Sequence, residues 1–445
     1  MTWQAQPSRP PGEALGAHIV VVTIPQPGHV LPTLAVVSEL VRRGHRVTYV
    51  ASEEFAGPVR EAGADVFLPL VGRPPVGAIP DGDLEAGVLL LARQASELVP
   101  RLLDVFARDR PDVVLHDLLA WGGQVAAHRM GVPAVQLNCS HAPYAGWETE
   151  MCGVSSLRQA AFHDAFRSLL SSNGVGVGLE SFLTEPSSGV VFTVRSFQRR
   201  PETVSEAHTF VGPALGPRSF QGDWHRSCAD RPLLAIAMGS SPDVSPSFVE
   251  ACVEAFEPVG WEVVMAVGDR IDPDRIGPDR AGPQDGAAVP ENFRLMRRIP
   301  QLSVLSQAGA FIGHGGMGSV MEAMYHGVPL VVVPRMAEQM VNARQVERLG
   351  LGRCLPPQGL TPGALREAFL DVVSDDRIAA RVRRMRQEVR TAGGARAAAD
   401  VVERAVRNGR PSLPPAGASY RVAREVVRGA PHGAGLPDTP LPRAH

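Results

Sequence analysis

Short runs of β-branched and aliphatic residues alternate with amphipathic segments through the first part of the chain. The runs predict buried strands at 18–24, 46–51, 112–115 and 133–137. Apolar residues at helical spacing predict helices at 34–43, 53–62, 84–108 and 121–129. The proline-rich segment 25–32 is predicted to be a loop. Strands that alternate with helices in this way indicate a parallel, doubly wound α/β sheet.

The same alternation restarts in the second half of the chain. Strands are predicted at 233–238, 262–267, 310–312 and 330–333. Helices are predicted at 246–256, 316–325, 338–349, 362–373, 376–391 and 394–407. The fold class is therefore α/β, with two Rossmann-like, doubly wound domains that face a central cleft. Ligands of such folds bind at the carboxyl ends of the parallel strands.

The domain limits follow from shifts in composition. We expect a flexible N-terminus at 1–16, a first domain at 17–217, a linker at 218–232, a second domain at 233–407 and a disordered tail at 408–445. Residues 140–200 lack clean periodicity and mix Gly, Ser, Met and aromatic residues. We expect this stretch to be a mobile region that recognises the substrate.

Composition excludes several classes of protein. The 445 residues carry a net charge of −2, and all 44 basic residues are arginine, so a broadly basic nucleic-acid surface is not expected. The five cysteines are scattered and form no C-x-x-C pattern, which argues against a disulfide framework or a zinc site. No apolar stretch approaches the ~20 residues of a membrane span, and no signal peptide is recognisable. We expect a cytoplasmic protein with no stable membrane anchoring.

The segment 311–329 carries the clearest chemistry, because a strand, a glycine-rich turn and a helix follow one another there. Free N–H groups and the dipole at a helix N-terminus attract a diphosphate, and glycines allow it to approach. Ser319 and His314 add side-chain donors, and Glu322 lies one turn further along, where it suits the hydroxyls of a ribose. The Gly313-x-Gly315-x-x-Gly318 spacing also fits a dinucleotide site, so an NAD(P)-dependent oxidoreductase is an alternative. A turn that serves only strand–helix packing is another.

Residues 292–350 resemble the donor-binding signature of the family 1 glycosyltransferases, especially the bacterial macrolide glycosyltransferases, and the similarity extends from about His18 to Arg407. This resemblance implies the GT-B fold, with an acceptor-binding N-terminal domain and a nucleotide-sugar-binding C-terminal domain. It also implies a reaction that needs no metal and no cofactor and that inverts the anomeric carbon.

The resemblance assigns roles to residues of the second domain. The pyrophosphate group would be held by His314, Gly316, Gly318, Ser319, Gly239 and Ser240. Glu322 would bind the ribose. Glu338 and Gln339 match an acidic–Gln pair that grips hexose hydroxyls, and Asn342 follows on the same helix. The alternative for Glu338 and Gln339 is that they only form a solvated helix N-terminus, because acidic residues are favoured at such positions in any protein.

One segment departs from the pattern of the family. Where the family has Trp-Val-Pro-Gln, with the Trp stacked on uracil, this chain has Arg298-Ile-Pro-Gln301. The planar guanidinium of Arg298, or of its neighbour Arg297, can stack on a base instead. The choice between uracil and thymine therefore stays open.

Transfer to an alcohol needs a general base, and histidine titrates in the right range. His29 follows the first strand in a Gly-His-x-x-Pro segment, whose histidine is the base in the family that the chain resembles. Asp117 follows the strand 112–115 and matches the acid that orients this base. A structural loop histidine and a helix-capping aspartate are the alternatives. His116 competes with His29, but strand alternation predicts that it points away from Asp117.

The acceptor pocket is expected in the first domain, lined by Trp121, Tyr144, Trp147 and Met151, with plain core packing as the alternative. Asp81-Gly82-Asp83 resembles a metal-binding D-x-D, but we interpret it as a surface turn and expect no metal.

These observations predict an inverting transferase that moves a hexose from a nucleotide sugar, with UDP-glucose favoured, to a hydroxyl of a hydrophobic macrolide or other polyketide. A dTDP-deoxysugar transferase of antibiotic tailoring is the alternative within the class, and a non-catalytic partner of another enzyme lies outside it. The expected partners are the donor and a small hydrophobic acceptor, with the chain as a monomer or homodimer.

Overall fold

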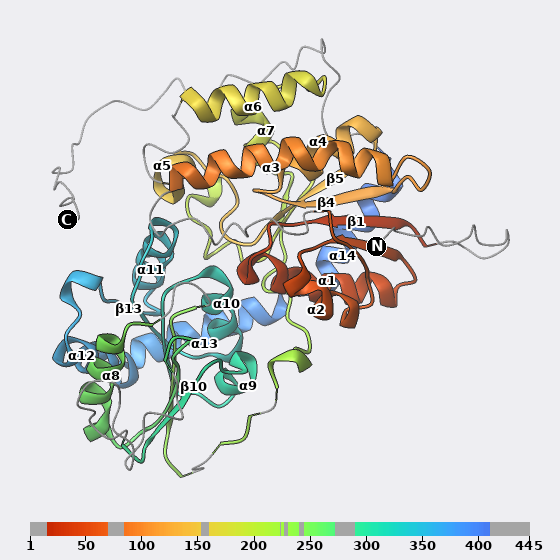
Figure 1. The fold of residues 1–445 in the computed structure, drawn as a ribbon. Coiled ribbons are helices and arrows are strands. Elements are labelled where there is room, and N and C mark those ends of the chain that lie inside the picture. Colours follow the sequence, from red (N-terminus) through yellow and green to blue (C-terminus); the bar gives the residue numbers. More distant parts are fainter. Residues whose placement is uncertain are drawn as a thin grey trace.

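The computed structural model describes residues 16–69, 84–152, 160–222, 224–226, 230–239, 244–271 and 290–409. Two lobes are visible in Figure 1, each built on a parallel sheet covered by helices. The first sheet has seven strands in the order β3-β2-β1-β4-β5-β6-β7, and the second has six in the order β10-β9-β8-β11-β12-β13. In each sheet the chain starts near the middle and winds outward in both directions, which confirms the predicted doubly wound α/β class.

The first lobe contains the N-terminal sheet and most of its covering helices. Its strands are β1 (His18–Val22), β2 (Arg46–Val50), β3 (Asp65–Phe67), β4 (Val113–Asp117), β5 (Ala134–Asn138), β6 (Gly189–Val191) and β7 (His208–Phe210). Its helices are α1 (Pro27–Arg42), α2 (Ala56–Glu61), α3 (Leu84–Val105), α4 (Trp121–Met130), α5 (Trp147–Cys152), α6 (Ala160–Ser172) and α7 (Leu179–Thr184). Alternate residues of β1 join different cores, because successive side chains of a strand point to opposite faces. Ile19 and Val21 pack with α1, whereas Val20 and Val22 pack with α3 and α4.

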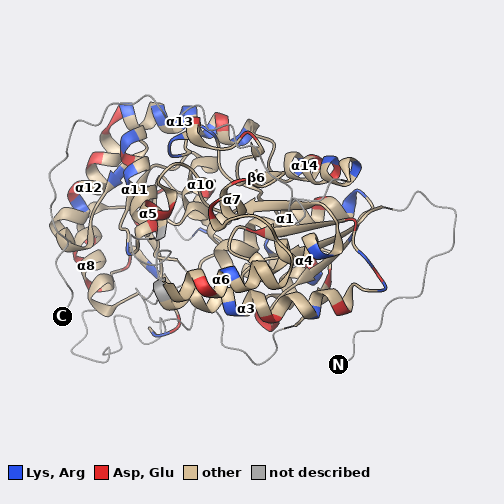
Figure 2. Cartoon of the chain, turned by 90° about the horizontal axis from the view of Figure 1, so that it is seen from above, with Lys and Arg blue, Asp and Glu red and all other residues tan. Residues whose placement is uncertain are grey.

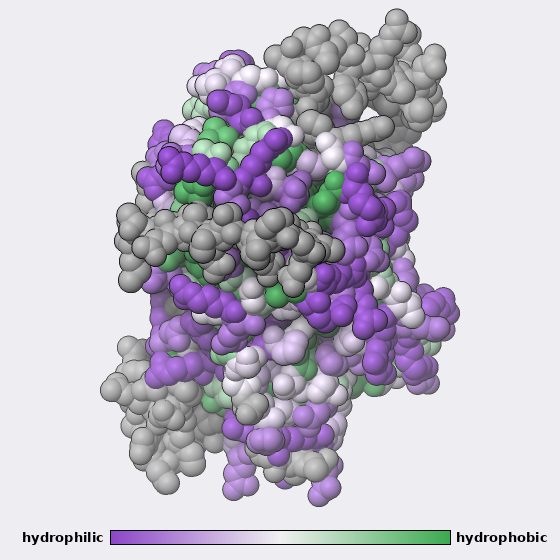
Figure 3. Space-filling model, turned by 90° about the vertical axis from the view of Figure 1, so that its right-hand side faces the viewer, coloured by the Kyte–Doolittle hydropathy of each residue, from purple (hydrophilic) through white to green (hydrophobic). Residues whose placement is uncertain are grey.

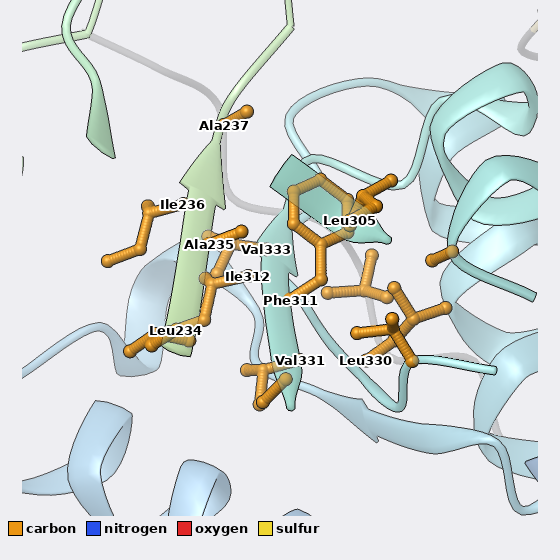
Figure 4. Packing of buried hydrophobic residues seen from close by; sticks show 14 of the residues in the cluster. Leu234, Ala235, Ile236, Ala237, Leu305, Phe311, Ile312, Leu330, Val331 and Val333 are labelled. Carbon is orange, nitrogen blue, oxygen red and sulfur yellow. The ribbon is translucent and has the colours of Figure 1, made fainter. Parts of the chain in front are cut away.

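The second lobe repeats this plan around a smaller sheet. Its strands are β8 (Leu233–Ala237), β9 (Glu262–Ala266), β10 (Phe293–Met296), β11 (Ala310–Gly313), β12 (Leu330–Val332) and β13 (Gly352–Cys354). The helices that follow the linker are α8 (Pro246–Phe256), α9 (Gln301–Leu305), α10 (Met317–His326), α11 (Ala337–Leu349), α12 (Pro362–Ser374), α13 (Asp376–Thr391) and α14 (Gly394–Asn408). Figure 4 shows the aliphatic side chains of β8, β11 and β12 packed together in the centre of this lobe.

The last helix returns to the first lobe. Ala398, Val401 and Val402 of α14 are buried in the same core as α1 and the odd-numbered residues of β1. Arg43, the residue that directly follows α1, reinforces the contact through ion pairs with Asp400 and Glu403 of α14. Residues 394–408 therefore belong to the first core, although they follow the second sheet in the sequence. The domain limits given above remain predictions.

The structure corrects one sequence expectation near the first strand. The segment 25–32 is not a loop, because α1 begins at Pro27 and includes Pro32. Proline is compatible with the first turn of a helix, where its missing N–H has no partner to lose. The short strands β3, β7, β10 and β13 were not predicted, and 140–200 contains three helices and the unpredicted strand β6. Ser240, the Asp81–Asp83 segment and the tail from 410 lie outside the described residues.

The outer surface is polar on the faces in view. Figure 2 marks charged residues on the outer helices, with basic residues along α13, and Figure 3 shows a mostly hydrophilic face with small hydrophobic spots. Within the described ranges, no helix is both long enough and apolar enough to cross a membrane.

Candidate active site

The predicted site residues gather where the carboxyl ends of the two sheets meet. Asp117 ends β4, and the loop after β5 carries Ser140. In the second lobe, His314 follows β11 and Glu338 lies in the first turn of α11, shortly after β12. A hydrogen bond of 2.7 Å from Ser140 Oγ to Glu338 Oε1 joins the two lobes at this point. The packing of α5 against α11, visible in Figure 1, holds the same junction from outside.

His29 and Asp117 form a hydrogen-bonded pair in the first lobe. The third residue of α1 brings His29 Nδ1 to 2.7 Å from Asp117 Oδ2. The Asp117 side chain is 1% exposed, whereas 24% of the His29 side chain is open to solvent. The second carboxylate oxygen of Asp117 accepts the backbone N–H of Leu119 at 2.8 Å. The aspartate is thus fixed from both sides, and the imidazole keeps an accessible edge.

The charges of the pair determine its protonation. Burial alone raises the pKa of Asp117 and lowers that of His29, but their mutual attraction and hydrogen bond reverse both effects. The pKa of His29 is raised above its ordinary value, with a smaller contribution from the charge of Glu338. The pKa of Asp117 is lowered. An ionised carboxylate only accepts hydrogen bonds, so Nδ1 carries the proton and Nε2 offers its lone pair.

Two neighbours of the pair have other roles. His116 is buried beneath Gly123 on the other side of β4, as predicted, and burial lowers its pKa to about 4. Cys139 directs its thiol to Asp117 Oδ2 at 3.6 Å, and burial raises the pKa of this thiol well above the ordinary value. The ligand atoms of His29, Asp117 and Cys139 lie within 4.8 Å of one another. A metal ion there would need the thiolate, which burial disfavours.

The glycine-rich turn is shaped around the imidazole of His314. A Cβ atom would come within 2.5 Å of this ring at Gly316 and within 2.8 Å at Gly239, whose φ is +90°. Gly315 has a φ of +88°, and a Cβ there would meet Val332 at 2.6 Å. Burial and Arg335 lower the pKa of His314 to about 4, so the ring is neutral near pH 7. At Gly318 a Cβ would meet nothing within 4 Å, which leaves open space before α10.

A polar network surrounds Glu322 on α10. Gln301 Nε2 donates to Glu322 Oε2 at 2.7 Å and to Ser319 Oγ at 3.0 Å. Arg218, from the segment between the lobes, donates to Glu322 Oε1 at 2.6 Å. The structure thus brings the predicted residues Gln301, Ser319 and Glu322 together and adds Arg218, which was not predicted.

The start of α11 is partly buried, and Glu338 has polar partners from both lobes there. Glu338 Oε1 accepts hydrogen bonds from Ser140 and from Asn342 Nδ2, and burial raises the pKa of its carboxyl. Asn342 also donates to Gly315 O at 2.8 Å, which links α11 to the glycine-rich turn. Gln339 is buried and its side chain accepts the N–H of Arg335. Sequence reasoning missed Ser140, because the contact crosses between lobes.

Arg298 does not occupy a buried position. Its side chain is 78% exposed and pairs with Asp269 at 2.9 Å, on the loop after β9. Its neighbour Arg297 donates to the backbone carbonyl of Asp269 at 3.5 Å. Either guanidinium lies at the rim of the second sheet's carboxyl end, beside the start of α9.

The predicted acceptor residues belong to one hydrophobic cluster. Trp121 packs edge-on against Phe166 deep in this cluster, as a core residue does. Tyr144, Trp147 and Met151 are also buried in it, at and before α5. Val341 of α11 joins the same cluster from the other lobe. The three residues near α5 therefore adjoin the lobe junction, and Trp121 lies further from it.

Comparison with known proteins identifies the family. A family model described as erythromycin biosynthesis protein CIII-like, C-terminal domain, matches residues 263–405. The NDP-glycosyltransferase YjiC of Bacillus licheniformis is 36% identical over 401 residues, covering 87% of this chain and 97% of that protein. The oleandomycin glycosyltransferase of Streptomyces antibioticus is 33% identical, covering 87% and 90%. Among solved structures, the glycosyltransferase of kitacinnamycin matches with a TM-score of 0.77 and 32% identity, covering 88% and 99%.

Proposed function

Because the chain belongs to the family 1 glycosyltransferases of the GT-B fold, related to those of macrolides and other natural products, we propose that it is an inverting hexosyltransferase. The donor is a nucleotide sugar, with UDP-glucose favoured, and the acceptor is a hydroxyl of a hydrophobic natural product. The observation that carries the proposal is the His29–Asp117 pair, which lies close enough to Glu338 of the second lobe to be affected by its charge.

His29 acts as the general base. Its Nε2 removes the proton of the acceptor hydroxyl while the oxygen attacks the anomeric carbon of the sugar. Asp117 holds the ring in the required tautomer and stabilises the imidazolium that forms. The charge of Glu338 adds to this stabilisation. Because the acceptor approaches from the first lobe and the nucleoside diphosphate leaves toward the second, the configuration inverts.

The second lobe binds the leaving group. The N–H groups at the start of α10 and the neutral ring of His314 meet the diphosphate, whose charge grows as the glycosidic bond breaks. Gln301 and Glu322 bind the ribose, and Glu338 and Gln339 bind the hexose. Hydrogen bonds from the start of α10 and from His314 stabilise the negative charge that develops in the transition state, so the proposed reaction needs no metal and no cofactor.

The acceptor lies against the first lobe near α5. Tyr144, Trp147 and Met151 offer an apolar wall beside the junction, which suits an aglycone such as a macrolide. Support for this class comes from the relatives, since one acts on oleandomycin by its name and another belongs to kitacinnamycin.

A dTDP-deoxysugar donor is the second candidate, and Arg298 favours it. An exposed arginine stands where the family has the tryptophan that stacks on uracil, so uracil loses its usual partner here. The oxidoreductase alternative is not carried forward, because the family accounts for the glycine-rich turn.

The test is product formation with defined donors. The enzyme is incubated with UDP-glucose or dTDP-glucose and a hydroxylated macrolide such as oleandomycin, in buffer with and without EDTA. Mass spectrometry should detect a hexosylated product that EDTA does not reduce, and NMR of the product should give a β-anomeric coupling from the α-linked donor. His29→Ala should abolish turnover. An α-linked product, or full turnover by the variant, would reject the mechanism, and full turnover would revive a non-catalytic role for this pair.

A further inference from the structure

We propose that Arg218, in the segment that joins the lobes, is a positioning residue for the donor nucleotide. It holds the Glu322 carboxylate in place and aims it at the hydroxyls of the ribose. This inference rests on the proposed function, because it concerns the nucleotide site of that reaction. Arg218 was not predicted from the sequence, since it lies outside the glycine-rich segment and 104 residues before Glu322.

The contact is short and buried. Arg218 NH2 lies 2.6 Å from Glu322 Oε1, and the two side chains are 9% and 6% exposed. Surface arginines usually hold their carboxylates loosely, but removal from water strengthens this pair and restricts both side chains. Without Arg218, the carboxylate would keep a single charge-neutral donor, Gln301, in a site that excludes most water.

The pair defines which atoms face the ligand. Oε1 is occupied by Arg218 and Oε2 by Gln301, so the plane of the carboxylate is fixed from two sides. Each carboxylate oxygen accepts more than one hydrogen bond, so each keeps capacity for a ribose hydroxyl. Gln301 in turn is held by Ser319 at the glycine-rich turn. The ribose would therefore meet a preorganised acceptor pair rather than a mobile side chain.

The position of Arg218 in the chain links the proposed nucleotide site to the segment between the lobes. Arg218 directly precedes the 3-10 turn Ser219–Gln221. It also lines a cavity of about 340 Å³, together with Pro300 and Ser303 at the start of α9. The segment between the lobes is thereby tied to the nucleotide site by one side chain. The Arg218–Glu322 ion pair would therefore hold both the bound ribose and the linker in place.

The test compares nucleotides that differ only in the ribose hydroxyls. Binding of UDP and of 2′,3′-dideoxyuridine diphosphate is measured by calorimetry on the full chain, for the wild type, Arg218→Met and Arg218→Lys. If dTDP is the preferred nucleotide, dTDP and its 3′-deoxy analogue take their place. The control is Arg226→Met, which removes another linker arginine from a buried carboxylate, Glu262, at the amino end of β9 and away from the site.

We expect Arg218→Met to weaken UDP about tenfold and to leave the dideoxy nucleotide within twofold, with Arg218→Lys intermediate and Arg226→Met without effect. In a Glu322→Gln background, Arg218→Met should cause no further loss of UDP affinity. This background also removes the negative charge that Arg218→Met alone would leave buried without its partner. Equal weakening of both nucleotides, or no weakening of either, would overturn the inference. A wild type that binds UDP and its dideoxy analogue equally would also overturn it. A wild type that binds no nucleoside diphosphate would instead reject the proposed function.

Discussion

Replacement of Asp117 by asparagine tests the catalytic pair with the least change in shape. Oδ1 accepts the N–H of Leu119 at 2.8 Å, and Oδ2 accepts the Nδ1 proton of His29 at 2.7 Å. In the variant, the amide oxygen must stay on the Leu119 side, because an NH2 group there would face another donor. The NH2 group therefore faces Nδ1 of His29. The ring then keeps its proton on Nε2, where the lone pair is needed.

The size of the effect follows from two contributions. Loss of the correct tautomer removes general-base catalysis, which contributes ~10²–10⁴-fold in rate. Loss of the negative charge also lowers the pKa of His29. Two unit charges about 4 Å apart attract by about 4 kcal/mol at an effective dielectric constant of 20. Because burial of both groups opposes part of this attraction, we expect the pKa of His29 to fall in the variant by less than the full attraction would give.

The assay is the steady-state rate at saturating donor, measured across pH 5–9. In the wild type, kcat/KM for the acceptor should fall as the pH drops through the raised pKa of His29, because the protonated ring cannot accept a proton. In Asp117→Asn, kcat should fall by at least 100-fold, and the remaining acid limb should move to lower pH. Asp112→Asn is the matched control, since Asp112 lies just before the same strand at its far end and accepts the N–H of His18. A variant that keeps a tenth or more of kcat, or an acid limb that moves upward, would refute the reasoning.

Three further changes probe the second lobe. Gly318→Ala should leave the melting temperature unchanged, since a Cβ there meets no protein atom within 4 Å, but should weaken UDP several-fold in calorimetry because it fills the space before α10. Glu338→Gln should raise KM for the donor and shift the acid limb of kcat/KM to lower pH, because the charge that helps to raise the pKa of His29 is lost; an unshifted limb would separate Glu338 from the base. Arg298→Trp should tighten UDP binding by roughly tenfold, as stacking contributes about 1–3 kcal/mol per base, while unchanged binding would locate the base elsewhere.

The fold was predictable because its signals are local. Runs such as 19–22 and 233–238 are continuously apolar, as strands buried on both faces are, and the helices between the strands have clear apolar spacing. The unpredicted strands β3, β7, β10 and β13 are three or four residues long and partly exposed, so they lack that pattern. The start of α1 was wrong for a different reason. Pro27 and Pro32 are each read as a helix breaker in isolation. Pro27 stands at the first helical position, which tolerates proline, and α1 includes Pro32 in its interior although that position lacks the N–H of the helical hydrogen bond.

Within the site, the sequence could identify residues that lie in compact motifs but not the contacts between motifs. His314, Ser319 and Glu322 are adjacent in one segment, and the structure brings Gln301 to the same network. His29 and Asp117 are 88 residues apart, and their pairing was predicted from the resemblance to the family together with the position of each residue after a parallel strand.

No comparable rule predicts which residues meet between the lobes. Ser140 reaches Glu338 across 198 residues of sequence, and Arg218 reaches Glu322 from the linker. No sequence motif surrounds Ser140 or Arg218, because the partner of each residue lies in a distant part of the chain. Both contacts nevertheless end on a carboxylate that the motifs had identified. The motifs therefore identify the carboxylates that we propose to bind the donor, while contacts from other parts of the fold determine how those carboxylates are oriented.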